Sequence, residues 1–302
     1  MSEANGGLTT HDVAVIGCGL MGAALARAFA KSGYSVAVWN RTPERAEALA
    51  GEGIRPVRSV GDAVGSSRLV VACLSTCAAT LSALAPAAGW HGTTLVNLAS
   101  STPDEAEELE RWAAKRGAEY LDGAIVCYPQ DIGSSDATIV FSGSPAAWSE
   151  HERTLTALGG APRHVSDQVT AVSLLDVGVI GAFGVTALSA YVEGATYVLG
   201  QGVPAAALRE HTQLALGTLR RAVEEAAAAI ASGNHRTDQA TLATYAEGAR
   251  AGLAVMRGAG HRARLLEAAT ENLALAEAAG LGTLGFAAQT TVVGSADSAK
   301  EV

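Results

Sequence analysis

Three glycines near the start of the chain have the spacing of a dinucleotide-binding turn. Gly17, Gly19 and Gly22 follow an apolar stretch typical of a strand and precede a helical one. Such glycines permit a tight turn and a close approach of the backbone to a pyrophosphate, which the helix N-terminus then faces. The strand–turn–helix context makes the pattern far more specific than the glycines alone. We therefore predict cofactor binding by Gly17, Gly19, Leu20, Met21 and Gly22.

The second predicted strand ends in residues that favour a phosphorylated dinucleotide. NAD-binding chains usually place Asp or Glu here to bind the ribose hydroxyls, whereas this chain reads Trp39-Asn40-Arg41-Thr42. Arg41 can stack on an adenine and contact a 2′-phosphate, and Thr42 and Arg45 can add donors. The sequence predicts NADPH as the cofactor, bound by Asn40, Arg41, Thr42 and Arg45. The alternative is that both arginines are only solvated charges at the start of a helix.

Two further segments follow predicted strands, where cofactor sites gather in open α/β sheets. Both offer small hydroxyls and backbone donors to the nicotinamide half of the cofactor. The alternative is ordinary loop and helix capping, since Ser101 or Thr102 before Pro103 makes a good helix start. The predicted cofactor-binding residues in these segments are Leu74, Ser75, Thr76, Asn97, Ala99 and Ser100.

The elements that position these residues alternate along the first half of the chain. Alternating strands and helices predict a parallel, doubly wound sheet. Near residue 166 the composition shifts to Ala, Leu and Glu with helical periodicity. We therefore expect an α/β fold with an N-terminal Rossmann-type doubly wound sheet, a long interdomain helix and an all-α C-terminal domain. The predicted domains are 1–166 and 167–302. The predicted helices of the second half are 168–199, 204–232, 238–256 and 261–279.

The helix at 168–199 is apolar on all sides. Its uncharged run, 177–192, falls short of the roughly 20 residues that a membrane-spanning helix needs, so we expect no membrane segment. A helix of this kind needs cover from more than one neighbour, and a partner chain is the simplest source. The sequence therefore predicts a homodimer.

Composition excludes several classes of function. The chain has 302 residues and a net charge of −9, and an acidic surface repels phosphate backbones, so nucleic acid is not an expected partner. Four cysteines without a CxxC pair and seven histidines without a paired motif indicate no metal site. The cysteines read as reduced thiols, and the N-terminal residues contain no signal segment. We expect a cytoplasmic protein.

Several segments together resemble the imine reductases of the 6-phosphogluconate and β-hydroxyacid dehydrogenase superfamily. The resemblance covers about residues 11–290, and the segment from Tyr128 to Gly133 is its most specific part. It implies NADPH-dependent hydride transfer to the C=N bond of a small-molecule imine or iminium, giving an amine. It also implies intertwined C-terminal domains, with each active site shared between two chains. The segments are GCGLMG, WNRT, NLASSTP and LDGAIVCYPQDIG.

The catalytic position departs from both branches of the superfamily. The hydroxyacid enzymes use a lysine on the long helix, but the lysines here are Lys31, Lys115 and Lys300, and the residue nearest that place is Asp176. This argues against the alternative of a β-hydroxyacid or alcohol dehydrogenase. Imine reductases commonly carry Asp or Tyr about two turns further on, where this chain has Phe183 or Gly184.

Neither Phe183 nor Gly184 can donate a proton. Either another group is the proton donor, or the substrate needs no proton donor. The predicted catalytic residues are Asp176 and Tyr128, each with a structural alternative: a buried polar tie for Asp176 and an edge residue for Tyr128. Weaker candidates are Tyr191, Glu193 and His235. Without an acid, we expect a preference for preprotonated or substituted iminium ions, or for bulky imines activated by solvent, with Asp176 as an electrostatic partner of the cation. A non-catalytic NADPH-binding protein is the remaining alternative.

Overall fold

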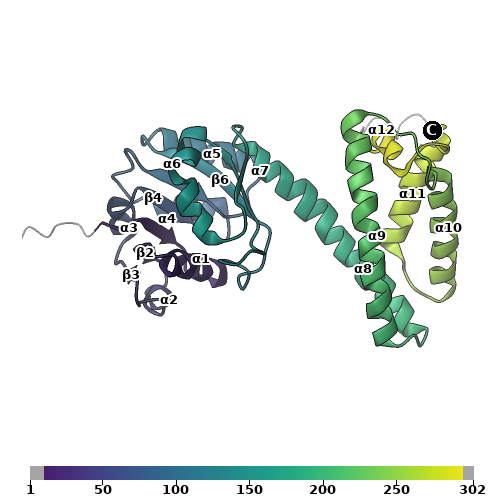
Figure 1. Ribbon diagram of the computed structural model, residues 1–302, viewed down its shortest axis with the longest axis horizontal. Coiled ribbons are helices and arrows are strands. Elements are labelled where there is room, and N and C mark those ends of the chain that lie inside the picture. The colour runs from purple at the N-terminus through teal and green to yellow at the C-terminus, as the bar shows by residue number, and fades with distance from the viewer. Residues whose placement is uncertain (1–9, 295–302) are drawn as a thin grey trace, which may run out of the picture. The chain divides into compact units, whose positions relative to one another are not determined.

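The computed structural model describes residues 10–294. The chain divides into two compact units, one ending at Ala182 and the other beginning at Phe183 (Figure 1). The predicted fold class, a Rossmann-type sheet followed by helices alone, is confirmed. The predicted domain boundary at 166/167 remains a prediction.

One eight-stranded sheet forms the centre of the first unit, in the order β3-β2-β1-β4-β5-β6-β7-β8. All neighbouring strands are parallel except β6 and β7, which are antiparallel. The strand order reverses between β1 and β4, which is where open α/β sheets bind ligands. The strands are β1 Val13–Ile16, β2 Val36–Trp39, β3 Ile54–Pro56, β4 Leu69–Ala72, β5 Thr94–Asn97, β6 Glu119–Ile125, β7 Ile139–Gly143 and β8 Arg163–Ser166.

Helices cover both faces of this sheet. One core cluster joins alternate strand residues, such as Val15 and Val71, to α1 Leu20–Lys31 and α6 Pro145–Leu155. A second cluster joins the intervening residues, such as Ile16 and Val70, to the helices on the other face. Because side chains alternate along a strand, each buried strand supplies apolar residues to both clusters. The helices of the second cluster are α3 Val60–Ser66, α4 Cys77–Leu84 and α5 Pro103–Ala114.

Side-chain caps begin several of these helices. Thr102 accepts a hydrogen bond from the Glu105 backbone, and the Glu105 carboxylate accepts one from Thr102 in return, a capping box that starts α5. Ser59 and Asp62 form the same arrangement at α3. The short helix α2 Pro43–Glu47 begins at a proline.

The long helix is not α-helical throughout. It consists of α7 Thr170–Leu175, a π-helical segment Asp176–Val185 and α8 Thr186–Gly200. The middle segment carries Gly178, Gly181 and Gly184. Glycine is a weak α-helix former, so departure from α geometry costs little there. The sequence predicted the extent of this helix but not its π-helical middle.

The helical run Thr170–Gly200 is long and apolar enough to cross a membrane by length and composition. Only 11% of its most apolar window is buried within the chain. A helix that packs against a second chain passes the same test, so length and composition alone do not indicate a membrane role.

The second unit is entirely helical among its described residues. Its small core consists of buried residues from α10, α11 and the 3₁₀ helix Phe286–Gln289, among them Leu242, Leu273 and Ala288. The structure begins α10 at Leu242, after the cap of Thr241, rather than at 238. The helices are α8, α9 Ala205–Ser232, α10 Leu242–Gly258, α11 Arg264–Ala278 and α12 Thr290–Val293 (Figure 1).

Candidate functional site

The predicted glycine turn lies between β1 and α1. Gly17 has a φ of +101°, and a Cβ there would collide with the carbonyl oxygen of Cys73 at the end of β4. A Cβ on Gly22 would collide with the carbonyl oxygen of Gly17. These two glycines therefore hold the turn, the helix and β4 together closely. Gly19 differs, since a Cβ there would meet no protein atom within 4 Å.

The N-terminus of α1 is open to an anion. Gly19 is its N-cap and supplies no side-chain cap, and the first turn contains no acidic residue. Leu20, the first helical residue, is 85% exposed. The first backbone N–H groups of a helix lack partners within the helix and attract negative charge. This arrangement fits the pyrophosphate of a dinucleotide.

Asn40 holds the turn to the end of β2. Its Oδ1 accepts a hydrogen bond from the backbone N–H of Cys18 at 2.9 Å, and its Nδ2 donates to the carbonyl oxygen of Thr42 at 2.9 Å. Arg41, Thr42 and Arg45 are exposed, and neither arginine forms an ion pair with a described residue. The guanidinium groups and the Thr42 hydroxyl are therefore free to meet a 2′-phosphate.

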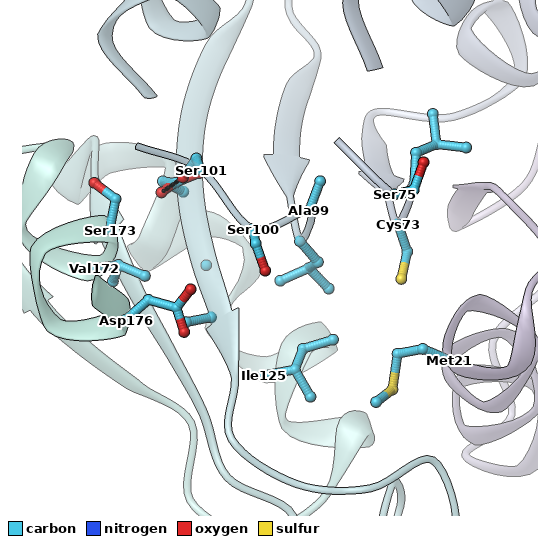
Figure 2. A pocket seen from close by; sticks show the side chains of 15 residues that line it. Met21, Cys73, Ser75, Ala99, Ser100, Ser101, Ile125, Val172, Ser173 and Asp176 are labelled. Carbon is cyan, nitrogen blue, oxygen red and sulfur yellow. Dashed lines mark hydrogen bonds between the residues drawn. The ribbon is translucent and has the colours of Figure 1, made fainter. Parts of the chain in front are cut away.

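A cavity of about 230 Å³ lies at the carboxyl ends of β4, β5 and β6 (Figure 2). Figure 2 shows Met21 and Cys73 on one side of it and Asp176, Val172 and Ser173 on the other. Burial raises the pKa of Cys73 to about 11, so this thiol is protonated and neutral at neutral pH. The remaining lining residues are Leu74, Ser75, Leu98, Ala99, Ser100, Ser101, Asp122, Gly123, Ala124 and Ile125.

Asp176 is the half-buried acid of this cavity. It follows α7 and begins the π-helical segment, and its carboxylate points into the cavity on the side of Ser100 (Figure 2). No described residue donates a hydrogen bond to that carboxylate. Of the described residues that line the cavity, none is lysine, arginine or histidine. Asp176 therefore has no basic side chain opposite it among the described residues that line the cavity.

A hydrogen-bonded cluster of buried polar side chains supports the loop after β5. Asp122 of β6 accepts hydrogen bonds from the Asn97 amide at 3.0 Å, the Tyr120 hydroxyl at 3.0 Å and the Ser101 hydroxyl at 2.9 Å. Asn97 also donates to the carbonyl oxygen of Ala99 at 3.0 Å. The sequence prediction did not include Asp122, Tyr120 or Ser101 as site residues.

Burial raises the pKa of Asp122, and the nearby Asp176 adds to that rise, while the three hydrogen bonds oppose it. Burial also raises the pKa of Tyr120 well above its usual range. A signal for this cluster was present in the sequence: a carboxylate within a strand of mainly apolar residues must find buried partners.

The structure brings most of the predicted cofactor residues to one end of the sheet, but it uses some of them internally. Asn97 is fully buried in the Asp122 cluster, and Thr76 caps α4 by accepting a hydrogen bond from Ala79. Leu74, Ser75, Ala99 and Ser100 line the cavity. Their roles toward a cofactor remain predictions.

Tyr128 lies away from the cavity lining. Its side chain is 71% exposed, and its backbone N–H donates to the Asp131 carboxylate at 2.9 Å within the same loop. Its predicted catalytic role remains a prediction without support from the cavity.

The weaker acid candidates lie in the second unit, where the side chains of Glu193 and Tyr191 have structural partners. Glu193 accepts hydrogen bonds from the backbone N–H groups of Leu265 and Leu266, at the start of α11. Tyr191 accepts one from the Thr212 hydroxyl at 3.4 Å. His235 lies in the loop after α9. Its backbone carbonyl accepts a hydrogen bond from Gly285, but its ring Nδ1 is buried and has no hydrogen-bond partner among the described residues.

Comparison with known proteins places this site in a family. The family described as the NAD binding domain of 6-phosphogluconate dehydrogenase matches residues 12–181. The C-terminal domain of NADPH-dependent reductive aminase-like proteins matches residues 169–295. The solved structure of an imine reductase from Pseudomonas sp. is 30% identical, with a TM-score of 0.86 over 93% of this chain and 99% of that one. The chain belongs to the imine reductase family.

Two related structures contain the phosphorylated cofactor. An imine reductase from Myxococcus stipitatus in complex with NADP+ is 30% identical, with a TM-score of 0.85 over 93% of this chain and 99% of that one. A reductive aminase from Aspergillus terreus in complex with NADPH and ethyl levulinate is 26% identical, with a TM-score of 0.86 over 94% of this chain and 99% of that one. The predicted family and enzyme class are confirmed, and the cofactor bound in these two related structures is of the predicted NADP type.

Curated relatives align over shorter stretches. The NADPH-dependent reductive aminase of Aspergillus oryzae is 29% identical over 174 residues, which are 57% of this chain and 59% of that protein. The cytokine-like nuclear factor N-PAC of Homo sapiens is 25% identical over 162 residues, or 51% of this chain and 29% of that protein. The aligned stretches thus span about three-fifths or less of these two relatives.

Proposed function

We propose that this imine reductase transfers a hydride from NADPH to the carbon of a small-molecule imine or iminium and releases an amine. The observation that carries the proposal is the cavity between Met21, which lies within the glycine motif, and Asp176. It lies beyond the carboxyl ends of three parallel strands, next to the uncapped N-terminus of α1. The residues along that edge would hold a dinucleotide, which would supply its hydride at the cavity.

The residues present fit NADPH and perform the work of holding it. Gly17, Gly19 and Gly22 admit the pyrophosphate to the N-terminus of α1, and the guanidinium groups of Arg41 and Arg45 hold the 2′-phosphate. When bound, NADPH supplies the hydride.

The protein then positions the C=N carbon in a restricted space. The Asp176 carboxylate stabilises the positive charge of an iminium facing it.

A hydroxyacid or alcohol dehydrogenase is less well supported. Such enzymes in this superfamily use a lysine, and the described lining of the cavity contains none. A non-catalytic NADPH-binding protein is a further alternative, and the match to N-PAC, whose name denotes a nuclear factor, is the observation in its favour.

NADPH consumption separates these functions. The full chain is incubated with NADPH and a panel of cyclic imines and quaternary iminium ions, and absorbance loss is followed. We expect turnover on members of this panel. In the reverse direction, with NADP+ and small hydroxyacids, we expect none. NADPH binding by fluorescence without turnover on any C=N compound would favour the non-catalytic alternative.

We further propose that the chain works as a homodimer with intertwined C-terminal domains. None of the residues of α8 or α9 is buried within the chain, although α9 is 28 residues long. Large apolar side chains are exposed along both helices, and contiguous exposed apolar surface marks interaction sites. They include Leu188, Tyr191, Val192, Leu214, Leu219, Val223 and Ile230.

Light scattering at micromolar concentration tests the dimer, with twice the chain mass expected. Replacing Leu219 with Glu puts a charge into the expected interface and should shift the mass toward the monomer. The exposed Arg111→Glu substitution on α5 is a control that should leave the mass unchanged.

We also propose a cytoplasmic location, which the free state of the four cysteines supports. Fractionation of cells that express the chain would test this location.

A further inference from the structure

One buried carboxylate beside the cavity has no part in the function proposed above. Asp122 is 1% exposed, yet it contributes to the cavity lining. Its Oδ1 accepts hydrogen bonds from Tyr120 and Asn97, and its Oδ2 accepts one from Ser101. All three donors are neutral. A carboxylate held in a buried place by neutral donors alone retains much of its desolvation cost.

Among the described residues, the titratable groups that act on Asp122 and its cluster are acidic. Tyr120 lies two residues before it on β6, Cys77 of α4 contacts Asn97 of the same cluster, and the charge of Asp176, at the end of α7, acts on it. Burial and the charge of Asp176 raise the pKa of Asp122, so its carboxyl keeps a proton to higher pH than an exposed aspartate does. Glu105 on α5 adds further negative charge near Cys77.

Ser101 connects Asp122 to the space where the substrate sits. It lines the cavity, and its hydroxyl lies 2.9 Å from Oδ2 of Asp122. A serine hydroxyl both donates and accepts hydrogen bonds. When Asp122 carries a proton, the same pair of atoms is bridged in the opposite direction, with Asp122 donating to Ser101. The hydroxyl hydrogen of Ser101 is then free for an acceptor in the cavity.

We propose that Asp122 supplies the proton of the product amine through the hydroxyl of Ser101. The inference rests on the function proposed above and answers the question raised by Phe183 and Gly184, which cannot donate. Ser101 is the residue that meets the substrate. Asp122 acts through it and does not touch the reacting atoms.

The step balances in atoms and charge. The hydride of NADPH forms the new C–H bond, and the π electron pair of C=N moves to nitrogen. Nitrogen takes the hydroxyl hydrogen of Ser101 as the O–H bond breaks. Oγ of Ser101 takes the hydrogen from Oδ2 of Asp122, which becomes a carboxylate. Solvent in the cavity returns a proton to Asp122 before the next turnover.

Rates on two substrates distinguish a role of Asp122 in supplying the proton from a purely structural role. The first is a neutral cyclic imine, which needs a proton at nitrogen. The second is the N-methyl iminium ion of the same ring, which gives a neutral tertiary amine without one. A positioned acid typically contributes about 10²–10⁴-fold. For Asp122→Asn we expect kcat to fall roughly 100-fold on the imine and less than about threefold on the iminium ion.

Ser101→Ala should give the same split, because it removes the hydroxyl that carries the proton. Asp12→Asn is the matched control: Asp12 is an exposed carboxylate that accepts hydrogen bonds from Ser35 away from the cavity. It should change neither rate. NADPH affinity, measured by fluorescence, should stay within about threefold in all three variants, since the relay does not hold the cofactor.

The pH dependence gives a second readout. In the wild type, kcat on the imine should fall as pH rises through the pKa of Asp122. The kcat on the iminium ion should not show this decrease. Equal losses on both substrates, or no loss on the imine, would overturn the relay while leaving imine reduction intact. Wild-type protein inactive on both substrates would overturn the proposed function and the relay together.

Discussion

The carbonyl oxygen of Gly17 occupies the space that a side chain on Gly22 would need. The two residues belong to the same motif, but they act differently from its middle glycine, Gly19, beside which the protein leaves open space. Gly19 has a φ of −70°, which any residue can adopt. The fold therefore requires glycine at positions 17 and 22. At position 19 only a bound ligand could require it.

This difference predicts opposite results for two alanine substitutions. Gly22→Ala should lower the melting temperature and abolish NADPH binding, because backbone must move to admit the Cβ. Gly19→Ala should leave the melting temperature within about 1 °C, since surface changes of this kind cost less than about 0.5 kcal/mol. It should still weaken NADPH binding at least tenfold by blocking the pyrophosphate. Calorimetry measures the melting temperature, and fluorescence titration measures NADPH affinity. An equal loss of stability in the two variants would contradict the different roles of Gly19 and Gly22.

Arg41 should set the preference for NADPH. A hydrogen bond to a charged group is worth about 1.5–3 kcal/mol, so Arg41→Ala should lower kcat/KM for NADPH roughly 10- to 100-fold. The value for NADH should remain within about threefold, because NADH carries no 2′-phosphate. Arg111→Ala, on the exposed face of α5, is the control. Equal losses with both cofactors would show that Arg41 holds the adenine or the fold instead.

Asp176→Asn should lower the rate on both a quaternary iminium ion and a neutral imine by about tenfold or more, because charge stabilisation in a restricted site is commonly worth that much. Steady-state rates on the two substrates measure the effect. Loss confined to the neutral imine would make Asp176 the proton donor in place of the Asp122–Ser101 pair. Unchanged rates on both would leave Asp176 only a structural role.

Asp12 should make stability depend on pH in the acid range. The backbone N–H of Ser35 and then its hydroxyl lower the pKa of Asp12 in the folded protein. A lowered folded pKa stabilises the protein above the unfolded value of about 3.9, and that contribution disappears as pH falls through the folded pKa. The melting temperature of Asp12→Asn should therefore lie below that of the wild type at pH 7. The gap should close as pH falls from 5 toward 3, and a constant gap would contradict this origin.

Local signals predicted the elements that frame the site. Strong apolar runs ended by glycine or polar residues marked β1, β2, β4 and β5, and Pro103 after Thr102 marked the start of α5. Helices α3, α4 and α6 and strand β3 were not predicted. α3 and α4 are short, seven and eight residues, and their apolar residues do not repeat at a clear helical period. Their caps, Ser59 and Thr76, were the available signals.

The sequence predicted the residues of the cofactor-binding turn more reliably than the polar residues beside the cavity. A glycine motif follows from local geometry, whereas the Asp122 cluster joins residues of two strands and a loop that only the sheet brings together. Counting turns from Asp176 also assumed α geometry. The structure has a π-helical segment there, with a wider turn, so positions counted along an α-helix do not project to the same face.

The bonds of Asn40 bear on how this chain could be re-engineered to accept the cheaper unphosphorylated cofactor. The familiar change would install Asp at this position to grasp the ribose hydroxyls. Here that carboxylate would keep an acceptor for Cys18 but would set a negative oxygen against the carbonyl of Thr42, where the amide now donates. The Asn40→Asp substitution would therefore destabilise the turn that is meant to bind the new cofactor. A redesign should therefore leave Asn40 in place and begin at the neighbouring solvent-facing positions, where no contact within the protein is lost.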